Sequence, residues 1–84
     1  MSYKSLQQLR DEQQAHHNRA LRLLEEAAEI YKKLKYTTSI EEHMNLQKQW
    51  LEKDTQARAE VERSIELTKQ FIRELERLKN RNLN

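Results

Sequence analysis

The sequence contains no cysteine, no glycine and no proline. Without cysteine the chain can form no disulfide and offers no thiolate to a metal. Without glycine and proline it lacks the usual turn formers, and its abundant Leu, Glu, Gln, Lys, Arg and Ala favour helix at nearly every position. These features together predict an all-α protein.

Long apolar runs are also missing from the 84 residues. No run approaches the about 18 apolar residues of a membrane span. The first residues, MSYKSLQQLRDEQQ, have no hydrophobic segment typical of a secretory signal. We therefore expect a cytoplasmic protein with no membrane partner, with export by a route that reads no N-terminal signal as the open alternative.

Neither sign of charge dominates the chain. Sixteen basic and fourteen acidic residues give a formal net charge of +2, and the two signs are mixed along the sequence. This distribution is not that of a cationic nucleic-acid-binding arm. Because 84 residues with 36% apolar side chains bury little core, we expect stability to depend on partners.

A helix is predicted from Ser39 to about residue 80. Ser39 and Glu42 fit the capping box S-x-x-E, with Thr38 and Glu41 as an overlapping alternative. Apolar side chains recur in two adjacent seven-residue series, which make a stripe wide enough for two neighbours. The first series is Met44, Leu51, Arg58, Ile65 and Ile72, and the second is Trp50, Ala57, Ser64, Phe71 and Leu78. Polar residues from Asn80 onwards predict a frayed C-terminus.

A second helix is predicted over about residues 2–35. Its seam recurs at spacings of three and four: Leu6, Leu9, Gln13, His16, Ala20, Leu23, Ala27, Ile30 and Leu34. Leu24, Ala28 and Tyr31 widen the apolar surface toward its C-terminal end.

Only three or four residues, around Thr37, separate the two helices, and such short connections usually join antiparallel neighbours. We therefore predict one helical-hairpin domain over residues 1–84. A continuous rod and an exchanged hairpin are the alternatives. Folding about residue 37 pairs residues whose numbers add to about 75, which sets the first series of the second helix against the first helix.

The second series is then left for a second copy. We predict a homodimer, as a four-helix bundle or an extended coiled coil. The expected interface residues are apolar and lie on the longer helix: Trp50, Ala57, Phe71, Ile72, Leu75 and Leu78. Trp50 is a candidate anchor for another protein, since tryptophan is enriched at interface hot spots.

The same pairing predicts a polar layer at the middle of the hairpin. Gln13 and His16 would face Asp54 and Arg58, which also form an i,i+4 ion pair. Such a layer costs stability but can fix register and partner number.

Nothing in the sequence indicates catalysis or a bound cofactor. No nucleophile and base occur in a recognisable arrangement, so we expect neither an enzyme nor a small-molecule substrate. His16 and His17 point about 100° apart on a helix, and inward Glu-x-x-His pairs are absent, so we expect no metal site.

The favoured function is that of a non-enzymatic protein–protein interaction module: an adaptor, chaperone, regulator or inhibitor that docks a helix face onto a partner protein. The alternative is a nucleic-acid-binding bundle that uses a basic ridge, namely Lys69, Arg73, Arg77 and Arg81. A structural subunit that stacks into larger assemblies is a third hypothesis.

Overall fold

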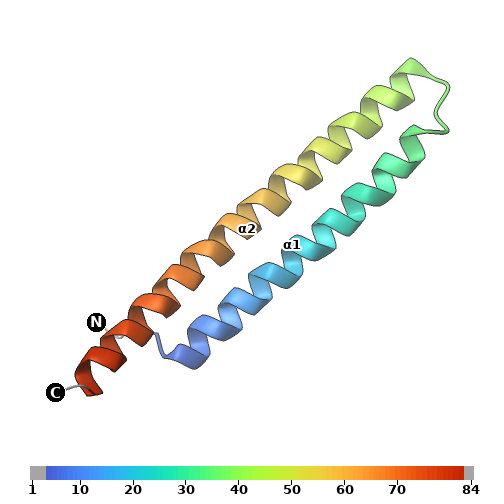
Figure 1. The fold of residues 1–84 in the computed structure, drawn as a ribbon. Helices are drawn as coiled ribbons and strands as arrows, with labels where there is room; N and C mark the ends of the chain where they lie inside the picture. The colour runs from blue at the N-terminus through green and yellow to red at the C-terminus, as the bar shows by residue number, and fades with distance from the viewer. Residues whose placement is uncertain (1–3, 83–84) are drawn as a thin grey trace.

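Two long antiparallel helices form a hairpin (Figure 1). The computed structural model describes residues 4–82, in which α1 spans Leu6–Leu34, α2 spans Ile40–Asn82 and no strand occurs. The molecule measures 68 × 21 × 15 Å between Cα atoms. The all-α prediction and the hairpin are confirmed, and within the described residues neither helix carries a segment apolar enough to cross a bilayer.

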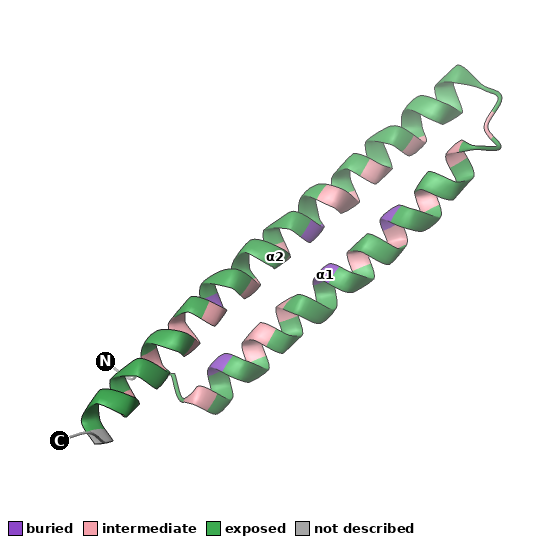
Figure 2. Cartoon of the chain, in the orientation of Figure 1, coloured by how far each residue is buried: buried purple, intermediate pink, exposed green. Residues whose placement is uncertain are grey.

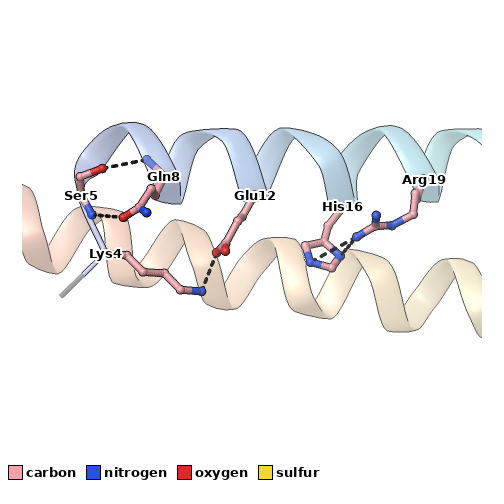
Figure 3. A network of polar contacts seen from close by, with 6 residues as sticks. All are labelled: Lys4, Ser5, Gln8, Glu12, His16 and Arg19. Atoms are coloured by element: carbon pink, nitrogen blue, oxygen red, sulfur yellow. Dashed lines mark hydrogen bonds and ion pairs between the residues drawn. The ribbon is translucent and has the colours of Figure 1, made fainter. Parts of the chain in front are cut away.

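α1 begins at a capping box, which places its start at Leu6 rather than near residue 2. The hydroxyl of Ser5 accepts a hydrogen bond from the Gln8 amide (3.1 Å), and the Gln8 side chain accepts one from the Ser5 amide (2.8 Å; Figure 3). These bonds satisfy two of the amide groups that a helix start leaves without partners.

The cap predicted for the second helix is confirmed. The Ser39 hydroxyl accepts a hydrogen bond from the Glu42 amide (3.3 Å), and α2 begins at Ile40. α2 then continues to Asn82, two residues past its expected end. The last residues of the predicted frayed terminus, Leu83 and Asn84, lie outside the described residues.

The connection between the helices is asymmetric. The Tyr36 amide donates to the Lys33 carbonyl (3.1 Å), and the Thr37 hydroxyl lies within 3.0 Å of the Lys33 and Leu34 carbonyls, so this turn closes the end of α1. Residues 37–39 belong to neither helix, and α2 starts beyond the end of α1 (Figure 1).

This overhang shifts the expected register. Glu26 pairs with Lys53 (2.9 Å) and Gln13 donates to Thr68 (2.8 Å). Lys53 lies four residues and Thr68 six residues further along α2 than a fold about residue 37 predicts, which is a shift of between one and two turns. The prediction was wrong because it treated the connection as symmetric.

The seam between the helices is narrow (Figure 2). Only five apolar residues are buried within the described chain: Leu9, Ala20, Ala27, Ala57 and Leu67. Of these only Leu67 is a large, completely buried side chain. Small side chains at the middle of both helices allow close approach, but they bury little apolar area.

The expected assignment of the two series of α2 is reversed. Ala57 is 1% exposed, and Trp50, Ser64, Phe71 and Leu78 are half-buried, so the second series lines the seam with α1. The first series is outside, with Met44, Leu51, Ile65 and Ile72 all about half exposed. The two series lie about 100° apart on the helix, so the shift of register is accompanied by a rotation of α2 about its axis.

Candidate interaction surface

Polar contacts interrupt the seam, but not between the expected partners. Gln13 bonds to Thr68, whose hydroxyl also donates to the Ser64 carbonyl (2.9 Å). His16 Nδ1 lies within hydrogen-bonding distance of the Glu60 carboxylate, and Arg19 Nη2 lies 2.8 Å from the same nitrogen. The predicted facing of Gln13 and His16 with Asp54 and Arg58 is therefore wrong.

One long face of the hairpin is polar and bridged by ion pairs. We call it the polar face; on α1 it comprises the positions that precede seam residues, among them Glu12, Arg19 and Glu26. Arg19 Nε lies 3.4 Å from Glu60, and Glu26 lies 2.9 Å from Lys53. Arg19 and Glu26 are thus paired across the two helices, whereas Glu12 pairs with Lys4 at the start of the chain's described part.

The ion pairs shift the pKa values of their members. The hydrogen bond from His16, supported by the charge of Arg19, lowers the pKa of Glu60 below its ordinary value. At the start of α1, the hydrogen bond from Lys4 (2.6 Å; Figure 3) lowers the pKa of Glu12. The hydrogen bond to Glu26 raises the pKa of Lys53.

The opposite long face is apolar and uncovered. We call it the apolar face; it comprises the positions that follow seam residues on both helices. In antiparallel helices, positions rotated in the same sequence direction from the seam lie on the same side of the pair. The exposed large apolar side chains of this face are Leu21, Leu24, Tyr31, Met44, Leu51, Val61, Ile65, Ile72 and Leu75.

Two surface depressions confirm that both helices contribute to the apolar face. Leu24 of α1 and Val61 of α2 line a depression of about 280 Å³, with Ala57 and Arg58 also in its lining. Tyr31 and Gln47 line another of about 190 Å³, nearer the connection. The small Ala57 side chain leaves room in the first depression for an apolar side chain from outside.

One ion pair lies on the apolar face. Arg58 Nε donates to Asp54 (2.8 Å), and the Arg58 side chain is 78% exposed while that of Asp54 is 18% exposed. The pair is neutral as a unit, so it lets the middle of the face approach another surface without a net charge.

The predicted interface residues are divided between the two surfaces. Ile72 and Leu75 are exposed on the apolar face. Trp50, Phe71 and Leu78 are half-buried along the seam, and Ala57 is buried there. The guanidinium of Arg10 also lies over the Phe71 ring, 5.9 Å from its centroid. Whether these residues contact another chain stays a prediction.

The predicted basic ridge lies away from the apolar face. Lys69 lies 4.0 Å from Glu66, and Arg77 Nε donates to Glu74 (3.1 Å), which lowers the pKa of Glu74. Arg73 and Arg81 are exposed on the same helix. The acidic neighbours reduce the positive potential that a phosphate backbone would meet.

Within residues 4–82, no group of three or more His, Asp or Glu side chains could hold a metal ion. No protein family matches this chain, and no curated protein or solved structure is significantly similar to it.

The signal for this face was present in the sequence. Leu24, Ala28 and Tyr31 widen the apolar pattern of the first helix, and Met44, Leu51, Ile65 and Ile72 form a regular series on the second. The fold about residue 37 set the latter series against the first helix, so the sequence pattern did not predict that the two groups combine into one surface.

Proposed function

We propose that this protein is a non-enzymatic protein–protein interaction module that docks its apolar face onto helices of another polypeptide. The observation that carries this proposal is the row of large aliphatic side chains, between 41 and 58% exposed, along one side only. Continuous apolar surface of this kind on a small protein usually marks an interaction site.

The shape of the face suits helical partners. It is two helices wide, and its exposed apolar side chains on α2 run from Met44 to Leu75 at spacings of three, four, seven and ten residues. A partner helix that presents apolar residues at the same spacings would bury a continuous strip. The depression beside Leu24 and Val61 gives such a helix a place to insert a side chain.

A matched pair of substitutions tests this function. Val61 and Ala59 are both exposed and lie two residues apart, but Ala59 precedes the seam residue Glu60 and belongs to the polar face. Immobilised full-length Val61→Glu should fail to capture a partner from native extract that wild type and Ala59→Glu both retain. The captured protein is then purified, and its affinity is measured for wild type, Val61→Glu and Ala59→Glu. Equal affinities for the three would refute the proposal.

The basic ridge supplies the competing function. Retention of wild type on heparin, but not of Lys69→Ala/Arg73→Ala, at about 0.1 M salt would favour nucleic-acid binding, because contacts to phosphate depend steeply on salt. Absence of retention leaves protein docking as the function of this module.

A further inference from the structure

We propose that the apolar face is covered by a second copy of this chain, so that two hairpins stack face to face as a four-helix bundle. The inference deepens the proposed function, on which it rests, by naming the partner.

The first argument is the thinness of the seam. Leu67, at 0% exposed, is the only large side chain fully buried within the described residues, and three of the other four buried residues are alanines. Two helices that bury so little rarely form a stable unit in water. A second pair of helices on the apolar face would convert its half-exposed side chains into the layers of a bundle core.

The second argument is the size of the face. Its apolar side chains on α2 run from Met44 to Leu75, a span of about 47 Å at about 1.5 Å per residue. A standard stable interface buries ~800 Å² on each partner, so a strip of this length needs a width of only about 17 Å, and the molecule measures 21 Å across. A covering chain must therefore be a rod of similar length to shield the whole row, and a second copy has that length.

The third argument is that the face can be its own complement. In a two-fold contact each surface supplies both projections and recesses. The depression lined by Ala57 is a recess, and the half-exposed Leu24 and Val61 at its edge are projections of aliphatic size. Both elements needed for interdigitation therefore occur on the same surface.

Charge does not oppose self-association. The chain carries a formal net charge of only +2, and Arg58 on the face is neutralised by Asp54 of its own helix. The charged pairs that bridge the helices, such as Glu26 with Lys53, lie on the polar face, which would remain in water. The other charged side chains of the face, such as Arg10 and Lys35, lie toward the ends of α1, and Glu62 lines the depression beside Arg58, so both signs of charge are present for a second copy to meet.

Sedimentation equilibrium on the full chain tests the inference. Wild type should have twice the 10.3 kDa mass of one chain, and Ala59→Glu should match it. Val61→Glu should weaken association by about a hundredfold or more, because two glutamates would be desolvated in one symmetric contact. A wild-type chain that is monomeric and fully helical by circular dichroism would overturn the inference.

A second measurement keeps the test valid if Val61→Glu fails to fold. Because the sequence has no cysteine, a thiol-reactive reagent would label only the cysteine that is introduced, and so would report on that position alone. A bis-maleimide reagent should link Val61→Cys chains into dimers much faster than Ala59→Cys chains; equal rates overturn the inference. If the wild-type chain is a monomer and still captures another protein through Val61, the inference of a second copy is wrong, but the proposed docking onto another protein stands.

Discussion

The polar and apolar faces of the hairpin lie on either side of the seam, two residues apart in sequence, and have opposite properties. On α1 the positions before seam residues include Glu12, Arg19 and Glu26, and the positions after them include Leu21 and Ala28. Arg19 and Glu26 are paired with charges on α2, whereas Leu21 is 47% exposed. The residue before a seam position thus lies on a surface of paired charges, and the residue after it lies on a surface of apolar side chains exposed to water.

This difference indicates which of the two faces can contribute more to the stability of the protein. Ion pairs on the polar face are partly exposed and screened, so they contribute modestly. The apolar face holds large side chains that are still 41 to 58% exposed, and burying them would be worth more than all the ion pairs together. Covering the apolar face with a partner would therefore increase the free energy of unfolding more than strengthening the ion pairs would.

The largest expected effect compares a seam residue with a neighbour on the apolar face. Leu67→Ala should lower the free energy of unfolding by ~2–5 kcal/mol, because it leaves a cavity at a completely buried site. Ile65→Ala should cost about 1 kcal/mol in dilute solution, since this side chain is already 49% exposed in one chain. Urea denaturation measures both.

Repeating the measurement at several protein concentrations tests whether a second chain covers Ile65. If a second chain covers Ile65, the cost of Ile65→Ala should rise with concentration toward that of Leu67→Ala, because association adds burial only to the former. A cost for Ile65→Ala that stays constant while the mass doubles would contradict the assignment of Ile65 to the covered face.

A smaller effect is expected from the ion pair on the apolar face. Replacing both members, as Asp54→Ala/Arg58→Leu, should tighten self-association about tenfold, because apolar residues replace a pair that must lose water on binding. Arg58→Leu alone should weaken it, since Asp54 would then be left with its charge uncompensated. The matched polar-face double, Glu66→Ala/Lys69→Leu, should leave association unchanged; a similar change in both doubles would contradict the difference between the faces.

The helices could be predicted from the sequence because their signals are local. Ser39 with Glu42 marks a helix start, and the absence of glycine and proline leaves few places for a break other than the residues around Thr37. The cap at Ser5 was missed although Ser5 and Gln8 fit the same capping-box pattern.

The register and the rotation of α2 could not be predicted because they depend on contacts between distant residues. The overhang of α2 depends on how Thr37 closes α1 and on the path of the next residues, which residue types alone do not specify. A symmetric fold about residue 37 set Leu51 and Ile65 against the first helix in place of Ala57 and Ser64. In the structure Ala20 and Ala57 are both buried, and small residues of this kind allow two helices to approach closely.

The smallest expected effect concerns the polar contacts and appears in acid. Since the folded chain lowers the pKa of Glu60 below 4.5, ionised Glu60 contributes stability above pH 4.5, and this contribution is lost as pH falls through the lower folded value. The free energy of unfolding of wild type should therefore decline below about pH 4.5. Glu60→Gln should flatten that decline and lower stability at neutral pH, where its contacts with His16 and Arg19 are lost.

Glu25→Gln, at an exposed position of α1, removes the same charge and should keep the wild-type slope. Chemical denaturation at a series of pH values measures both, and equal slopes for the two variants would show that the bridge across the polar face adds nothing to the stability of the hairpin.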